Sequence, residues 1–320
     1  MISVISLAVV IYLAKPGQLY QALRAANFQL VLAALGIMMI WLGVRAMAWR
    51  VLLQEKATYP QVFFAVNEGY LLNNILPFRL GEVARSFLLS LKAGLSFWEV
   101  FSTVLIERAL DLGIAAALLL ITLPFVVGGV WARQAALVAG VIVLAGIVTL
   151  YLLARNRVWA LNLFHKLAAR WPRLQQTVGQ SLEAFLNGLA VLTDGKRFLG
   201  ATGLMLLDWL IALIQYYVLI LAFLPNAPFL WAAFTLGVAA LGVAAPSSPG
   251  SLGVYELAIV GALALFGIDA APALAMALTA HLSQYLLVGV FGSIGLARDG
   301  ESLIGLYSRV RGITQQNTAE

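Results

Sequence analysis

The chain has 320 residues, of which 62% are hydrophobic and only 11% are charged. Soluble domains carry about 25% charged residues, so this mixture cannot cover a water-facing surface. Cysteine is absent, which excludes disulfides, thiolate metal sites and cysteine nucleophiles. The net charge of +6 comes from cations that flank hydrophobic segments, so nucleic-acid binding is not expected.

Apolar runs of about 20 residues, each long enough to cross the roughly 30 Å hydrocarbon layer as a helix, recur along the chain. The first run, residues 2–14, is short for a span, and it indicates either a trimmed crossing or an obliquely inserted helix. Full spans are predicted at about 27–47, 100–124, 132–153, 198–224 and 271–296.

The span at 27–47 ends in residues typical of a membrane interface. Arg45 and Arg50 follow its last apolar turns, and we assign both to the flanking basic region. Trp41 and Trp49 fit aromatic anchors at the same level of the membrane.

Two segments are interrupted near their middle. Residues 59–92 contain two apolar pieces of half-membrane length that meet at Pro77, and residues 228–245 and 254–267 flank Pro249. Proline lacks an N–H and disfavours helix at the preceding residue, so each helix should break there. Half-length helices around a break are typical of a re-entrant hairpin, whose broken backbone must be shielded by protein or line a wet cavity.

The two breaks share the pattern Pro-x-x-Leu-Gly, and each is followed by a carboxylate. Each also has a span before it and a span after it. The order predicts an inverted repeat, with repeat A at about 27–124, repeat B at about 198–296, and hairpins that open to opposite sides. The alternative is that two short loops coincide by chance in a Leu- and Gly-rich chain. The predicted fold class is therefore an all-α, polytopic bundle with two oppositely oriented re-entrant hairpins.

The distribution of cations predicts the orientation. Residues 155–197 are basic, with interleaved apolar and aromatic side chains, and this pattern predicts amphipathic helix in the membrane interface. Most of the 20 Lys and Arg residues fall on the side holding 48–58 and 155–197, which the positive-inside rule places in the cytoplasm. We expect a multi-pass protein of a bacterial-type inner membrane, with one transmembrane domain over 1–297 and a cytoplasmic tail over 298–320.

Ionisable side chains fall within the predicted hydrophobic region, where each charge costs roughly 2.5–3.5 kcal/mol. They should therefore face the bundle interior or a wet pathway. The group comprises Arg79, Glu82, Arg85, Glu107, Arg108, Asp111, Asp208, Glu256 and His281. Ion pairs that only hold helices together are one interpretation, and Glu82 and Arg85 share a helix face at i, i+3. A functional site is the other interpretation, because buried ion pairs rarely stabilise a fold relative to apolar packing.

Arginine presents a rigid fork of donors that matches phosphate, and half-helix N-termini offer free N–H groups. We predict that an anionic lipid headgroup is bound by Arg79, Arg85, Arg108, Asn73, Asn74, Glu82, Ser248 and Gly250. The residues predicted to form ion pairs or carry protons are Glu82, Glu107, Asp111, Asp208, Glu256 and His281. Capping of the broken helix by Asn73 and Asn74, and a simple interhelical hydrogen bond from His281, are the alternative roles.

Four motifs resemble the lysylphosphatidylglycerol synthase transmembrane-region family, also described as flippase-like membrane proteins. They lie at 45–50, 74–85, 107–111 and 246–256. The resemblance spans nearly the whole chain and implies an inner-membrane protein that moves or presents lipids across the bilayer. It places Arg79, Glu82, Arg85, Glu107, Arg108, Asp111 and Glu256 at motif positions.

The leading interpretation is thus a lipid flippase or transporter for an anionic phospholipid or lipid-linked intermediate, without cofactor or metal. The family's larger members add an aminoacyltransferase domain, and the chain ends at residue 320, so aminoacyl transfer is not expected. A lipid-modifying enzyme is an alternative, although the two histidines lie far apart and no nucleophile or metal set is recognisable. A partner subunit of a glycosyltransferase or lipid synthase, and homo-oligomerisation, also stay open.

Overall fold

The computed structural model describes residues 9–76, 79–126, 130–168, 171–244 and 249–300. These residues form helices and turns without a β-strand, which confirms the all-α class. The elements are α2 (Pro16–Ala25), α3 (Phe28–Leu52), α4 (Tyr59–Ile75), α5 (Gly81–Ala93), α6 (Phe97–Val126), α7 (Val130–Arg155), α8 (Arg157–Leu167), α9 (Pro172–Gly188), η2 (Leu189–Thr193), α10 (Gly195–Phe223), α11 (Phe229–Ala244), η3 (Pro249–Ser251), α12 (Val254–Ala264) and α13 (Ala270–Arg298).

Four helices in the described part of the chain, α3, α6, α10 and α13, are long and apolar enough to cross a membrane. They cover four of the five predicted full spans. The fifth, 132–153, lies within α7, and α7 with α8 forms a bent pair, with an angle of 85°, that would add one more candidate span. Of the first apolar run, residues 9–14 are described and helical.

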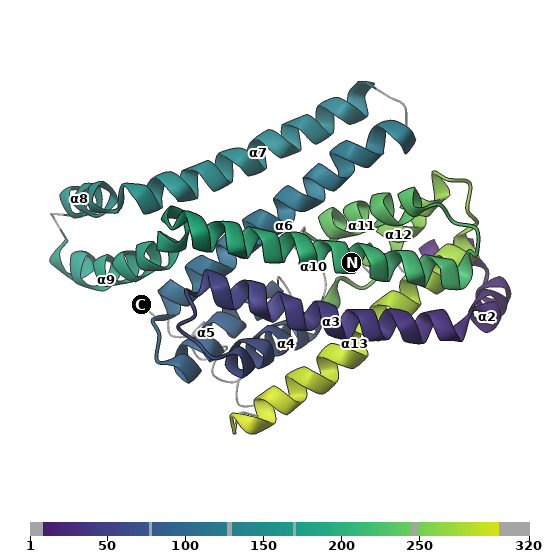
Figure 1. Cartoon of the computed structure of the whole chain (residues 1–320), viewed down its shortest axis with the longest axis horizontal. Helices are drawn as coiled ribbons and strands as arrows, with labels where there is room; N and C mark the ends of the chain where they lie inside the picture. The colour runs from purple at the N-terminus through teal and green to yellow at the C-terminus, as the bar shows by residue number, and fades with distance from the viewer. Residues whose placement is uncertain (1–8, 77–78, 127–129, 169–170, 245–248, 301–320) are drawn as a thin grey trace.

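The two interrupted segments are pairs of short helices, broken where the sequence predicts. α4 ends at Ile75 and α5 begins at Gly81, while α11 ends at Ala244 and α12 begins at Val254. Pro77 lies outside the described residues, and Pro249 begins η3. Within each pair the helices pack against each other, and the two pairs occupy opposite halves of the long axis in Figure 1.

The long helices pack against each other and against the short helices in matching pairs. α3 and α10 pack along each other, α4 packs against α13, and α11 packs against α6. α3 and α10 also begin alike, because Asn27 accepts hydrogen bonds from the N–H groups of Gln29 and Leu30, and Asp194 accepts one from that of Arg197. These caps satisfy N–H groups that lack partners in a first helical turn.

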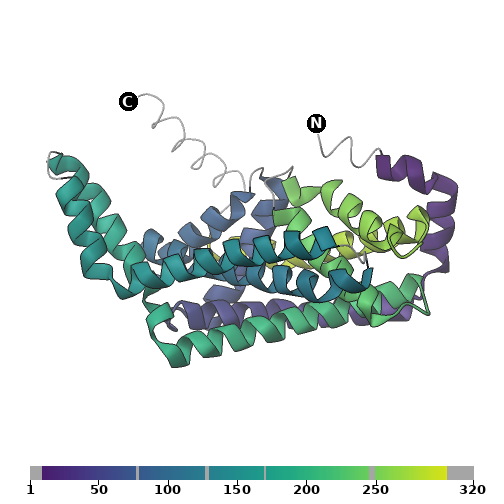
Figure 2. The ribbon, with the colours of Figure 1, turned by 90° about the horizontal axis from the view of Figure 1, so that it is seen from above.

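The predicted interfacial region 155–197 contains α8, α9, η2 and the start of α10. α8 and α9 lie side by side at one end of the bundle (Figures 1 and 2) and expose Trp159, Leu167 and Trp171. In contrast, Leu189 of η2 is fully buried against the long helices. The amphipathic stretch is therefore shorter than predicted, because η2 contributes to the core.

Two glycines on one helix provide a test of this packing. A Cβ on Gly292 would lie 2.8 Å from the carbonyl oxygen of Asn67 and 2.9 Å from Leu71 Cβ, both in α4, whereas one on Gly289 would meet nothing within 4 Å. We expect Gly292→Ala to lower stability by about 1–3 kcal/mol because α13 must move away from α4. Gly289→Ala should be neutral or stabilise by up to about 1 kcal/mol through helix propensity. Thermal unfolding in detergent measures both, and equal melting temperatures would contradict this packing.

Candidate functional site: a buried ionic network and its cavity

The centre of the polar region is Arg45, which projects from α3 into the bundle. Its Nη1 lies 2.9 Å from Asp111 Oδ1 and 3.1 Å from Asp208 Oδ2. Its Nη2 lies 3.0 Å from Glu107 Oε1 and also pairs with Asp111 Oδ2. Because the two partners Glu107 and Asp111 belong to α6 and Asp208 belongs to α10, one guanidinium joins three helices.

Two further arginines complete the network. Arg85 of α5 lies 2.8 Å from Glu82 and 3.2 Å from Glu107. Arg108 of α6 lies 2.6 Å from Glu107, 3.0 Å from Asp111 and 3.5 Å from Glu82. The i, i+3 pairing of Glu82 with Arg85 is thus confirmed. Shared carboxylates connect α5 to α3, α6 and α10.

The assignment of Arg45 to the membrane interface is wrong. Arg45 is only 3% exposed, because α3 continues to Leu52 and places Arg45 about two turns inside the helix end. Trp49 is fully buried as well; its Nε1 donates to Thr103, and Arg85 lies over its ring at 4.5 Å. Trp41 lines a cavity. A stripe of Trp41, Arg45 and Trp49 at four-residue spacing was the signal in the sequence that could have placed Arg45 inside.

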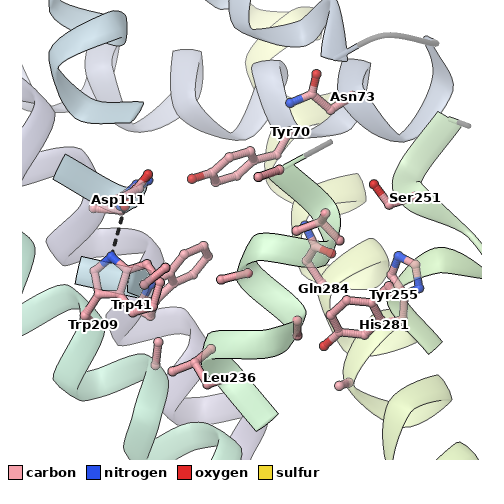
Figure 3. Close-up of a pocket in the computed structure, with 18 of the residues that line it drawn as sticks. Trp41, Tyr70, Asn73, Asp111, Trp209, Leu236, Ser251, Tyr255, His281 and Gln284 are labelled. Atoms are coloured by element: carbon pink, nitrogen blue, oxygen red, sulfur yellow. Dashed lines mark hydrogen bonds and ion pairs between the residues drawn. The ribbon is translucent and has the colours of Figure 1, made fainter. Parts of the chain in front are cut away.

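A cavity of about 450 Å³ lies beside the network, between the two helix breaks. Figure 3 shows residues of α3, α6 and α10 on one side of it and residues of the second break, α12 and α13 on the other. Its polar and aromatic lining consists of Trp41, Arg45, Tyr70, Asn73, Asn74, Arg79, Glu82, Arg108, Asp111, Asp208, Trp209, Gln215, Tyr216, Gly250, Ser251, Tyr255, His281 and Gln284. Its apolar lining includes Met38, Leu112, Leu236 and Val243.

Most of the predicted site residues therefore share one cavity. Arg85, Glu107 and Glu256 are buried behind the lining and support residues that reach it. Ser248 lies outside the described residues. Among the described residues, no group of three or more His, Asp or Glu side chains is placed to hold a metal ion.

Among the described residues, Arg79 differs from the other cavity arginines in having no carboxylate partner. In the described ranges its side chain makes no ion pair, whereas Arg45 and Arg108 each contact at least three carboxylates. It lies two residues before α5 with a φ of 57°, in the left-handed region that a non-glycine residue seldom adopts. The first break thus presents a partly buried guanidinium with free donors to the cavity.

The aromatic side chains of the cavity were not predicted as site residues, and three of them lie on the side of the ionic network. Trp41 and Tyr70 stack with ring centroids 6.0 Å apart and an interplanar angle of 10°. Trp209 donates its indole N–H to Asp111 Oδ1 at 3.0 Å, as Figure 3 shows. They give the ionic wall an apolar surface, which suits a ligand with both a charged and an apolar part.

Asn73 connects the two halves of the first interrupted helix. Its Oδ1 accepts the backbone N–H of Gly81 at 2.8 Å, so a residue in the last turn of α4 caps the start of α5. A Cβ at Gly81 would overlap Asn73 and the carbonyl of Gly69, so only glycine allows this approach. Of the two roles considered for Asn73, capping is confirmed, while Asn74 lines the cavity.

At the second break, Glu256 and His281 form a pair behind Gly250. His281 Nδ1 lies 2.5 Å from Glu256 Oε1, and its Nε2 lies 2.9 Å from the carbonyl oxygen of Gly250. Tyr285 also donates to that carbonyl, at 3.1 Å. The interhelical hydrogen bond considered for His281 is therefore present, and it joins α13 to both α12 and the break.

A further buried ion group lies away from the cavity and was not predicted. Lys92 at the end of α5 lies 2.7 Å from Glu68 Oε2 in α4 and also pairs with Asp299, which follows α13. Glu68 is fully buried, so this lysine compensates its charge. The contact fastens the first pair of short helices to the end of α13.

Comparison with known proteins gives relatives in archaea. A UPF0104 membrane protein of Methanothermobacter thermautotrophicus is 24% identical over 302 residues, covering 90% of this chain and 88% of that protein. A UPF0104 membrane protein of Methanocaldococcus jannaschii is 28% identical over 229 residues, covering 70% and 92%. The protein named glycosyltransferase AglD of Haloferax volcanii is 25% identical over 338 residues, covering 92% of this chain and 53% of that protein. No solved structure matches the chain significantly.

The family model described as lysylphosphatidylglycerol synthase TM region matches residues 1–292. This range includes both breaks, the ionic network and all of the cavity lining. The family resemblance of the four motifs is thereby confirmed, and the chain belongs to the lysylphosphatidylglycerol synthase TM region family of membrane proteins.

Proposed function

We propose that the protein is a lipid flippase or transporter that binds the anionic headgroup of a phospholipid or lipid-linked intermediate in the cavity. The observation that carries the proposal is Arg79, a guanidinium without a carboxylate partner in the described structure, at a helix break inside an apolar bundle. Guanidinium groups bind phosphate through two parallel N–H···O bonds. An anionic headgroup would supply the partner that the described residues do not provide.

The other arginines have a different role in this proposal. Arg45 and Arg85 are both paired with carboxylates, and their side chains are 4% and 1% exposed. They therefore form the wall of the site. Arg108, with a side chain 23% exposed, can add a second guanidinium contact to the headgroup. The predicted binding role of Arg85 becomes a supporting one.

The packing supports an inverted repeat. α3 to α6 and α10 to α13 have the same order of a long helix, two short helices and a long helix. In this correspondence α3 matches α10, α4 matches α11, α5 matches α12 and α6 matches α13. Replacing each helix by its match turns the contact of α4 with α13 into that of α11 with α6, and it leaves the contact of α3 with α10 unchanged. Such exchange is what a two-fold axis between repeats produces, and it favours pairing of real repeats over a chance likeness of loops.

The backbone at the two breaks supports the same repeat. Arg79 and Ser251 occupy the same place in the Pro-x-x-Leu-Gly pattern and have φ angles of 57° and 56°. We infer that both pairs of short helices are re-entrant hairpins entering from opposite faces, and α4 touches η3 where they meet. Rocking one repeat against the other would expose Arg79 to each leaflet in turn.

Orientation is part of the proposal. The end of the bundle that holds α8 and α9 also holds Arg50, Lys56 and Arg298, whereas the other end has Lys15 and Arg24 near α2. The positive-inside rule favours a cytoplasmic location for the α8–α9 end. The predicted inner-membrane location remains part of the proposal, in this orientation.

A second candidate function comes from one relative. The protein named glycosyltransferase AglD matches nearly all of this chain over about half of its own length. The match favours a role in which the membrane bundle presents a lipid to a glycosyltransferase. A lipid-modifying enzyme is the alternative that the same match supports. Incubation with a lipid extract followed by mass spectrometry distinguishes them: a flippase leaves every lipid mass unchanged, and a new lipid mass that requires the protein would assign catalysis.

The headgroup site is tested by removing its free guanidinium. In vesicles of phosphatidylcholine with fluorescently labelled phosphatidylglycerol, the wild type should exchange the labelled lipid between leaflets. Arg79→Ala should slow exchange roughly 10- to 100-fold, because hydrogen bonds to charged groups contribute about 1.5–3 kcal/mol. Arg24→Ala, which changes an exposed arginine of α2, is the matched control. Equal rates for the two variants would contradict the assignment of Arg79.

If Arg45 is a wall residue and Arg79 is a binding residue, their substitution should affect thermal stability differently. Arg45→Ala leaves three carboxylates without their shared cation, which should cost about 3–5 kcal/mol of stability. Arg79→Ala breaks no ion pair within the described structure and should leave the melting temperature near that of the wild type. Thermal unfolding of both variants in the same detergent checks this, and a larger loss for Arg79→Ala would overturn the division.

A further inference from the structure

The second break is joined to α13 through an imidazole and a carboxylate that share a proton. The carbonyl oxygen of Gly250 can only accept a hydrogen bond, so the 2.9 Å contact requires hydrogen on His281 Nε2. At 2.5 Å, Nδ1 and Glu256 Oε1 cannot both present lone pairs, so a second hydrogen lies between them. The pair therefore holds one proton more than a neutral imidazole beside an ionised carboxylate.

The surroundings of the pair bring few other polar groups to the carboxylate. Glu256 Oε2 accepts the backbone N–H of Gly253 at 2.7 Å, and within the described residues its other oxygen faces the imidazole. Tyr255 and Tyr285 lie on either side of the ring with centroids 4.6 and 4.4 Å away, and Tyr255 bonds to Tyr216 of α10. α11 contributes no titratable group.

The proton can leave through the cavity. Glu256 is fully buried and His281 is 5% exposed, but His281 and Gly250 both belong to the cavity lining. The charged groups that line the same space are Arg45, Arg79, Glu82, Arg108, Asp111 and Asp208. The carboxylates among them are paired with arginines, which keep their charge at all accessible pH values. Imidazole, by contrast, can either hold or release a proton.

We propose that His281 and Glu256 form a proton-binding site whose occupancy couples lipid movement to a proton gradient. Loss of one proton to the cavity leaves a single hydrogen on the ring, which stays on Nδ1 because the carboxylate of Glu256 is a stronger acceptor than a backbone carbonyl. The lone pair of Nε2 then faces the carbonyl oxygen of Gly250, so the contact that holds the second break against α13 opens. The first break lacks such a switch, because Glu82 is held by the guanidinium groups of Arg85 and Arg108.

The proton site itself is tested by nuclear magnetic resonance of imidazole nitrogen. The chain has two histidines, so His165→Gln leaves His281 as the sole signal. With rising pH we expect Nε2 to lose its proton while Nδ1, which faces the carboxylate of Glu256, keeps its own. In the same background, Glu256→Gln should show a neutral ring protonated only at Nε2 across the whole range. Tyr20→Phe, which changes an exposed tyrosine of α2, is the control and should titrate like the parent.

Two results would overturn the site: an imidazole that never changes protonation between pH 5 and 9, or titration that is identical in Glu256→Gln. Coupling, which rests on the proposed flippase function, is tested in the labelled-phosphatidylglycerol vesicles under an imposed pH gradient. For one proton per lipid, the leaflet ratio of the wild type should shift up to about tenfold per pH unit. Lipid exchange that ignores the gradient overturns coupling and leaves the flippase standing. No exchange at all overturns the flippase and its coupling together, while the resonance experiment still decides the proton site.

Discussion

The structure depends on one constraint: a charge placed inside an apolar bundle must find opposite charge there. Arg45 meets this constraint for three carboxylates at once, from α6 and α10, while lying in α3. Taking away any one partner exposes the others to an uncompensated charge, so the network resists rearrangement. It therefore forms one wall of the cavity, held together by ion pairs between α3, α5, α6 and α10.

The two breaks show how similar backbones come to carry different chemistry. Arg79 and Ser251 have almost the same φ, yet one places a guanidinium in the cavity and the other a hydroxyl side chain. The helix after each break is also fastened differently, by guanidinium–carboxylate pairs at Glu82 and by an imidazole–carboxylate pair at Glu256. Permanent charges suit a binding wall, and a titratable contact suits a moving part. The two pairs of short helices are thus held by different chemistry, which our proposals assign to binding and to movement.

The sequence predicted the features that depend on residues close together in the chain. Proline and the shared Leu-Gly pattern located both helix breaks, and the spacing of Glu82 and Arg85 predicted their pair. Arg45 was misplaced because an arginine near the end of an apolar run resembles an interfacial cation, and only the continuation of α3 buries it. The salt bridge of Glu68 with Lys92 was missed for a similar reason, since it depends on how α4 and α5 fold onto each other. Long-range partners require the tertiary structure.

Arg79 combines two unfavourable features, a left-handed backbone conformation and a guanidinium without a carboxylate partner among the described residues. A left-handed φ on a non-glycine residue costs on the order of 1–3 kcal/mol. Ser251 has the same φ without any charge, so this strain belongs to the shape of both breaks and needs no ligand to explain it. The lack of a carboxylate partner is specific to Arg79 among the arginines of the described network. The carboxylates of the network and Glu68 are each met by a cation within the described residues, and against that pattern an unpaired guanidinium at the cavity supports our proposal that an anion binds there.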